Sequence, residues 1–175
     1  MKKILIVFLL VLLAGCQKEV REDLFVLGIN GTEIVPGFDG PSSFTEADIA
    51  VYEEGILQPK EEASGDLYKD DLPVGTYKIF NPEKKKEKTY EESLLVYLEL
   101  YTDPFESLTL NGEALSSSMK ETCDAYEGEY LYHNGPYCVL KRESLKHYAT
   151  MILHGDITDL DQDRLDRIEI YIDEK

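Results

Sequence analysis

The stretch SLLVYLELYT, residues 93–102, alternates with the period of an extended strand. Successive side chains of a strand point to opposite faces, whereas the faces of a helix repeat every 3.6 residues. The two sets are Val96, Leu98 and Leu100 on one side, and Leu95, Tyr97, Glu99 and Tyr101 on the other. The segment therefore predicts a β-strand, and RIEIYI at residues 167–172 predicts a second one with an all-isoleucine face.

Asn-Gly dipeptides predict where several strands turn. They occur at residues 30–31 and 111–112 between strand-like segments, and at 134–135 between aromatic-rich arms. Asn-Gly is the preferred pair for a two-residue hairpin turn, because both positions need a positive φ. Each of the three dipeptides therefore predicts a hairpin.

Two segments carry helix signals. SFTEADIAVYEEG (43–55) and SMKETCDAYEG (118–128) each begin with a serine followed three residues later by glutamate, and each ends at glycine. A Ser-x-x-Glu capping box satisfies the first backbone N–H groups of a helix, and glycine ends one. The residues concerned are Ser43, Glu46 and Gly55 in the first segment, and Ser118, Glu121 and Gly128 in the second.

The order hairpin, helix, strands thus occurs twice along the chain. It predicts an α+β fold in which helices pack on one face of an antiparallel sheet, with two related strand–helix–strands units. The units would be residues 24–104 and 105–175, which can together form one domain. Coincidence of two ordinary α+β segments remains the alternative, and residues 57–73 are predicted to form a loop.

The first 16 residues begin with Lys2 and Lys3, continue with the apolar run ILIVFLLVL, which is too short to span a bilayer, and end in LAGC at Cys16. This order resembles a bacterial lipoprotein signal. The resemblance implies cleavage of residues 1–15, a diacylated Cys16 and a tether over residues 16–23. The protein would then be lipid-anchored on the extracytoplasmic face of a bacterial membrane. An ordinary secretory signal followed by a chance cysteine is the alternative.

Acidic residues dominate the composition, with 35 Asp and Glu against 18 Lys and Arg. Loss of Lys2 and Lys3 with the signal leaves 16 basic residues and a formal charge of −19. Such a surface repels polyanions, so neither nucleic acid nor anionic lipid headgroups are predicted as partners.

Cys123 and Cys138 are the two cysteines outside the signal. An oxidising compartment outside the membrane permits a disulfide between them, and two buried free thiols are the alternative. The chain has no GxSxG, Walker-type, GxGxxG or HExxH motif, so no catalytic residue, enzyme activity or cofactor is predicted beyond the lipid on Cys16.

The chain contains 12 tyrosines, several of them near the second helix segment. Tyrosine combines a large apolar face with a polar tip and is enriched in binding surfaces. Tyr130, Tyr132 and Tyr137 are therefore predicted as a binding surface on a hairpin. The alternative is that these rings fill the core between sheet and helix.

The acidic segment DLDQDRLD, residues 159–166, has alternating carboxylates as calcium loops do. Arg164 stands where such a loop needs glycine, however, and Ile170 stands where it needs glutamate. We therefore predict a polar turn without a metal. Asp159, Asp161 and Asp163 are retained as the residues of an alternative function, a small-ligand or calcium-binding sensor lipoprotein.

The segment 107–175 contains an extended segment ending in Asn-Gly, a serine-rich helix entry, a helix ending in AYEG, and a meander closing on IEIYI. In these features it resembles the small repeat units of β-lactamase-inhibitor-protein-like domains and of outer-membrane-assembly lipoproteins. The usual Gly-x-Pro after the helix is replaced by GEY. The resemblance implies a non-enzymatic envelope protein that presents a sheet face to another protein or envelope component.

Overall fold

The computed structural model describes residues 24–132, 135–156 and 163–175. Strands take up 51% of these residues and helices 8%. The predicted α+β class is therefore wrong, and the fold is mostly β. Two short helices cannot form a layer, and a second sheet covers much of the first instead.

One antiparallel sheet of seven strands forms the body of the molecule, in the order β10-β11-β12-β13-β7-β5-β4. Long runs of alternating residues supply its central strands. The bounds are β4 Glu62–Lys69, β5 Leu72–Phe80, β7 Leu94–Tyr101, β10 Glu129–Tyr132, β11 Pro136–Glu143, β12 His147–Gly155 and β13 Leu165–Glu174.

A second antiparallel sheet has four short strands in the order β2-β1-β8-β9, and β3 pairs with β6 separately. The bounds are β1 Leu27–Ile29, β2 Thr32–Ile34, β3 Ile56–Leu57, β6 Lys88–Thr89, β8 Leu108–Leu110 and β9 Glu113–Ala114; the helices are α2 Ser42–Glu46 and α3 Met119–Ala125. The Asn-Gly turns at 30–31 and 111–112 join β1 to β2 and β8 to β9, with positive φ at all four positions. These two hairpin predictions are confirmed, and the third falls on Asn134, which lies outside the described residues.

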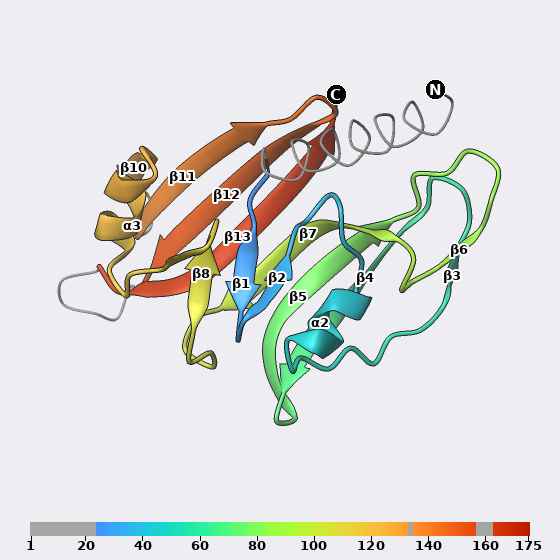
Figure 1. Cartoon of the computed structure of the whole chain (residues 1–175), viewed down its shortest axis with the longest axis horizontal. Helices are drawn as coiled ribbons and strands as arrows, with labels where there is room; N and C mark the ends of the chain where they lie inside the picture. Colours follow the sequence, from blue (N-terminus) through green and yellow to red (C-terminus); the bar gives the residue numbers. More distant parts are fainter. Residues whose placement is uncertain (1–23, 133–134, 157–162) are drawn as a thin grey trace, which may run out of the picture.

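The small sheet and both helices lie on the same side of the seven-stranded sheet (Figure 1). The core between the layers takes fully buried side chains from both, among them Leu27 and Ile29 of β1, Leu98 of β7, and Ile168 and Ile170 of β13. Burial of each such side chain stabilises the fold by about 1.5–3 kcal/mol. The isoleucine face predicted for RIEIYI is this buried face.

In each sheet, one of the two central paired strands comes from residues 24–104 and the other from residues 105–175. In the large sheet β7 pairs with β13, and in the small sheet β1 pairs with β8. Going outwards from these pairs, β5 and β4 follow on one side and β12 and β11 on the other. The segments 24–104 and 105–175 therefore share both sheets and one core.

The first helix is much shorter than predicted. Residues 43–55 were expected to be helical, but α2 ends at Glu46, because Asp48 takes a positive φ of 62°. The N–H groups of Asp48 and Ile49 bond back to the carbonyls of Thr45 and Phe44, which is a Schellman ending. The following β-branched residues favour an extended chain, and Ala50 bridges to Tyr68 of β4.

The predicted capping box at Ser43 is also wrong. The N-cap of α2 is Pro41, and the Ser43 hydroxyl donates to the carbonyl of Gly40. The capping box predicted at Ser118 is confirmed for the hydrogen bond that the serine side chain makes. Ser118 is the N-cap of α3, and its hydroxyl oxygen accepts a hydrogen bond of 3.0 Å from the Glu121 N–H.

Residues 57–73 are not a loop. They contain strand β4, which pairs with β5 over eight residues and forms one edge of the large sheet. The sequence EASGDLYK has little apolar alternation because an edge strand buries few of its side chains, and only Leu67 in β4 is fully buried.

Candidate functional site

The seven-stranded sheet has one face that no other helix or strand of the described chain covers. We call this the open face, and it consists of the side chains that alternate with the buried ones along the strands. Its members include Thr76, Lys78, Tyr97, Glu99, Tyr101, Tyr137, Val139, Lys141, Glu143, Tyr148, Thr150, Ile152, His154, Arg167, Glu169 and Tyr171. The open face is rich in tyrosine and in charged side chains.

The register places the open-face residues in rows across the strands. One row runs Tyr137, His154, Arg167 and Tyr101, from β11 to β7. In the next row Glu169 of β13 lies directly opposite Glu99 of β7. Directly opposed side chains have Cβ atoms about 4.5–5.5 Å apart, and like charges in this position repel. The centre of the open face therefore needs a cation.

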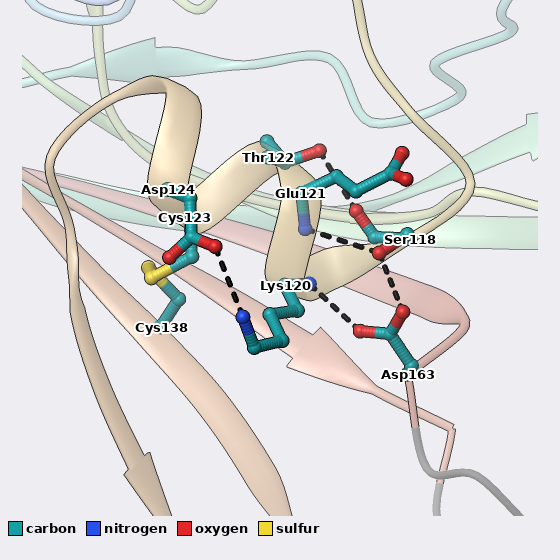
Figure 2. Close-up of a disulfide and its surroundings, with 8 residues drawn as sticks. All are labelled: Ser118, Lys120, Glu121, Thr122, Cys123, Asp124, Cys138 and Asp163. Atoms are coloured by element: carbon teal, nitrogen blue, oxygen red, sulfur yellow. Dashed lines mark hydrogen bonds and ion pairs between the residues drawn. A yellow bond between two sulfur atoms is a disulfide. The ribbon is translucent and has the colours of Figure 1, made fainter.

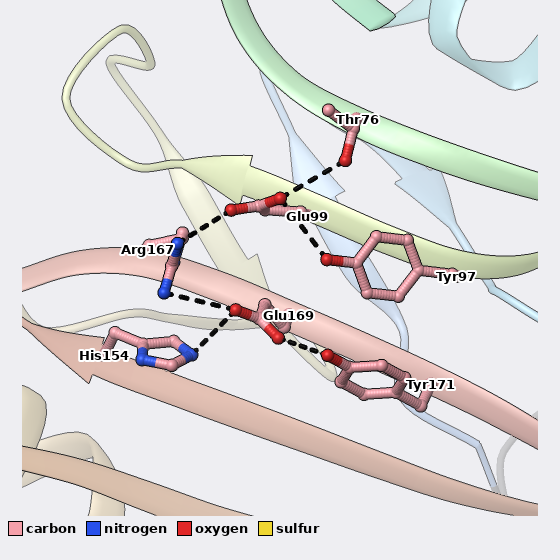
Figure 3. A network of polar contacts seen from close by, with 7 residues as sticks. All are labelled: Thr76, Tyr97, Glu99, His154, Arg167, Glu169 and Tyr171. Carbon is pink, nitrogen blue, oxygen red and sulfur yellow. Dashed lines mark hydrogen bonds and ion pairs between the residues drawn. The ribbon is translucent and has the colours of Figure 1, made fainter. Parts of the chain in front are cut away.

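Arg167 supplies that cation. Its Nη1 lies 2.9 Å from Oε1 of Glu99, and its Nη2 lies 3.3 Å from Oε1 of Glu169 (Figure 3). The side chains of Glu99, Glu169 and Arg167 are 17%, 12% and 31% exposed. Partial burial strengthens these ion pairs relative to pairs in bulk water. The guanidinium thus joins two carboxylates from neighbouring strands into one unit.

Hydroxyl groups complete the network. Tyr97 donates to Oε2 of Glu99 at 3.3 Å, Thr76 donates to the same oxygen at 3.2 Å, and Tyr171 donates to Oε2 of Glu169. Each tyrosine bonds to a carboxylate two residues away on its own strand, a spacing of about 6.6 Å. The two rings therefore extend along their strands (Figure 3), with centroids 4.9 Å apart.

The same contacts fix the protonation of the tyrosines and of His154. Burial, followed by the charge of Glu169, raises the pKa of Tyr97, and burial with the Glu169 hydrogen bond raises the pKa of Tyr171 to about 12. Both hydroxyls therefore stay hydrogen-bond donors. Burial and then Arg167 lower the pKa of His154, which makes the imidazole neutral at pH 7 although its Nε2 lies 3.0 Å from Glu169.

The predicted tyrosine surface is divided between the two faces of the sheet. Tyr130 lies opposite Cys138 in the β10–β11 ladder, so it points to the disulfide side, and Tyr132 opposite Pro136 points the same way. Both are exposed, at 46% and 66%, because β10 is an edge strand. Tyr137 lies opposite His154 and belongs to the open face. The structure therefore does not bring all three side chains together.

The predicted disulfide is present. Cys123 of α3 and Cys138 of β11 are bonded, with 5.8 Å between their Cα atoms (Figure 2). Both cysteines are fully buried, and the bond fixes the helix to the sheet. Gly128 lies against it, since a Cβ at this position would be 2.3 Å from Sγ of Cys138. Gly128 is therefore needed for packing; the left-handed residue that ends α3 is Glu127, with a φ of 54°, and not Gly128 as predicted.

Asp163 has a structural role at the start of α3 (Figure 2). One carboxylate oxygen accepts from the Ser118 hydroxyl, and the other accepts from the Lys120 N–H at 2.8 Å. A carboxylate at a helix N-terminus is stabilised by the first N–H groups. Asp159 and Asp161 lie outside the described residues, as does Cys16 with its predicted lipid.

Two features are absent from the described residues. No group of three or more His, Cys, Asp or Glu side chains in this part of the chain is arranged to hold a metal ion. In the same ranges no helix is both long and apolar enough to cross a membrane.

Sequence reasoning missed Glu99, Arg167 and Glu169 as a site. Their signal is the polar side of two alternating strands, YLELY at residues 97–101 and RIEIY at 167–171. Such polar positions are expected on any half-exposed sheet. Only the pairing of β7 with β13 brings the three charges together.

Comparisons with protein-family models, with curated proteins and with solved structures found no match for this chain.

Proposed function

We propose that the protein is a lipid-anchored, extracytoplasmic binding protein that captures another protein or envelope component through the open face. The observation that carries this proposal is the Glu99–Arg167–Glu169 network, which is held in place by hydroxyl groups before any partner binds. A pre-organised polar surface loses little entropy on binding. Exposed tyrosines beside it, Tyr101 and Tyr171, provide apolar contact area.

The lipid anchor is supported by the sequence from Lys2 to Cys16. A Cys16→Ser variant is expected to be released from the membrane fraction of expressing cells, because serine cannot form the thioether to the lipid. The wild-type chain should remain in the detergent phase after phase partition. Equal partition of the two proteins would contradict the anchor and leave the open face unaffected.

The open face is tested by replacing Tyr101 and Tyr171 together by alanine. This variant is expected to lose capture of the partner in a pull-down from the envelope of the source organism, about tenfold or more, since exposed tyrosines are frequent hot spots. The readout is the amount of each captured component, quantified by mass spectrometry against the wild-type protein.

Two matched variants complete that experiment. Tyr52→Ala with Leu145→Ala removes exposed apolar side chains at 62% and 81% exposure outside the open face, and capture should be unchanged. Tyr130→Ala with Tyr132→Ala tests the edge strand β10 separately. If only this last variant loses capture while all three stay folded, the contact surface is β10 and the open face is not used.

A further inference from the structure

Three strands of the large sheet finish at the same end of the molecule. Every neighbouring pair from β11 to β5 is antiparallel, so β5, β11 and β13 run in the same direction. Glu143 of β11 and Asp173 of β13 lie opposite the same residue, Tyr148. Tyr171 of β13 is in line with Lys78, two residues before β5 ends. The turn after β11 and the loop after β5 therefore project from one end of the sheet (Figure 1). We call it the tether end, and it comprises residues 24–25, 81–88, 142–146 and 175.

The predicted tether joins the fold at this end. A Cβ on Gly37 would lie 2.9 Å from Ile172 Cγ2 and 3.5 Å from Leu24 Cδ1, so Leu24 lies beside the last residues of β13. The segment 16–23 can span at most about 29 Å even if it were fully extended. A lipid on Cys16 would therefore keep the tether end close to the membrane.

Lysines are concentrated in the loop after β5. The run KKKEK at residues 84–88 contains four lysines, and the first three of them are exposed. With Glu83 and Glu87, four lysines against two glutamates give residues 83–88 a formal charge of +2. Nearby, Glu174 is paired with Lys60 at 3.8 Å. This loop is thus a basic segment in a chain whose net charge is strongly negative.

The turn between β11 and β12 carries more cations and an exposed apolar side chain. Leu145 is 81% exposed, and Lys146 beside it is also exposed. The Lys175 N–H donates to the Lys146 carbonyl at 3.0 Å, which brings another lysine to the turn, and its Nζ pairs with Glu143. With Arg142 and the four loop lysines, the tether end holds seven of the 16 basic residues that follow the signal.

The opposite end of the sheet is acidic in the described ranges. Lys69 and Arg164 are cations at that end, and Arg164 is paired with Asp103. The carboxylates there include Asp70 and Asp71 between β4 and β5, Asp103 and Glu106 after β7, and Asp156 after β12. The charge of the protein is therefore separated along the strands. An anionic surface attracts the tether end and repels the other end.

We propose that the tether end docks on an anionic phospholipid surface, with Leu145 inserted among the headgroups and the lysines of residues 84–88 on the lipid phosphates. The proposal rests on the lipid anchor of the proposed function. Net charge alone predicts no contact with anionic lipids, but a lysine held at such a surface strengthens binding about fivefold. The turn and the loop lie four strand spacings apart, about 19 Å, so two contacts would hold the strands upright. The open face would then point sideways, where a partner can reach it.

The test uses tryptophan as a probe, because the chain has none of its own. Leu145→Trp places it at the tip of the turn, and Leu72→Trp, at a position 66% exposed at the start of β5, places it at the opposite end. Residues 16–175 are coupled through the Cys16 thiol to a maleimide lipid in vesicles, since Cys123 and Cys138 are bonded to each other. The vesicles consist of phosphatidylcholine with brominated acyl chains, alone or with about 30% phosphatidylglycerol.

With phosphatidylglycerol present, the emission of Leu145→Trp should shift to the blue and be quenched by bromine at least about twofold more than in phosphatidylcholine alone. Leu72→Trp should show neither effect. Equal quenching at the two positions, equal quenching in the two kinds of vesicle, or no quenching of Leu145→Trp would overturn the proposal. Coupling does not depend on lipidation in the cell, so these outcomes concern the tether end alone, and the Cys16→Ser experiment tests the anchor separately.

Charge variants in the Leu145→Trp protein identify the cations. Lys85→Gln with Lys146→Gln should reduce the quenching by about half or more, and added sodium chloride should do the same. Lys69→Gln with Lys120→Gln is the matched control, because it removes the same charge at the end where β4 finishes and β13 begins. Quenching in this control should equal that of Leu145→Trp. Equal loss in both double variants would overturn docking through the tether end.

Discussion

Replacing Cys123 and Cys138 together by alanine is expected to lower the free energy of unfolding by about 3 kcal/mol. The disulfide closes a loop with a sequence separation of 15, and a loop of this size restricts the unfolded chain by about that amount in the chain-entropy model. Urea unfolding of the variant and of the wild-type protein measures the difference, from the midpoints and slopes of the two transitions.

A reducing agent provides the control for this result. Dithiothreitol should destabilise the wild-type protein by a similar amount and leave the double alanine variant unchanged, since the variant has no bond between Cys123 and Cys138 to reduce. A wild-type transition that does not move on reduction would contradict a stabilising role for the disulfide.

The second large effect is expected at the centre of the open face. Arg167→Met should lower the free energy of unfolding by roughly 2–4 kcal/mol, because Glu99 and Glu169 then face each other without a cation between them. Methionine retains most of the apolar stem of arginine, so the loss reports mainly the charge. Urea unfolding at pH 7 measures it.

Neutralising one carboxylate should restore part of this stability. In the double variant Arg167→Met with Glu169→Gln, the repulsion between the opposed carboxylates is absent, so the double variant should be more stable than Arg167→Met alone. Lys141→Met, an exposed cation on the same face, should change the stability by less than about 0.5 kcal/mol. If Arg167→Met behaves like Lys141→Met, the network does not stabilise the fold.

The strands of this protein could be predicted where side chains alternate with a period of two or where an Asn-Gly dipeptide marks a turn. The segments 93–102 and 167–172 and the Asn-Gly hairpins at 30–31 and 111–112 all have such signals, and all form the expected elements. These signals are local, because the period of two and the positive φ of a tight turn act within a few residues.

Helix length could not be predicted in the same way. The segment 43–55 has helical spacing throughout, yet it continues as extended chain after Asp48 because Ala50 bridges to Tyr68 on the edge of the large sheet. The contact with β4, a strand that follows in the chain, determines the extended conformation. Helix propensity does not predict such a contact. The error in fold class follows from this helix, together with the missed strand β4.

The candidate site was beyond sequence reasoning for a related reason. Tyr137 and Cys138 were singled out by residue type, and the structure places them on opposite faces of the same strand. Glu99 and Arg167 are 68 residues apart, and neither belongs to a motif. Long-range strand pairing determines such sites, and a single sequence does not specify that pairing.

The central pairing of β7 with β13 has a consequence for how the chain folds. β13 is the last strand in the chain order, yet it lies in the middle of the large sheet, while β1 pairs with the distant strand β8, with Leu27 opposite Leu110. Folds dominated by such distant contacts form slowly, in milliseconds to seconds. Strands β4, β5 and β7 lack the other half of their sheet until Leu165–Glu174 has been synthesised, so nearly the whole chain is needed before the large sheet can form.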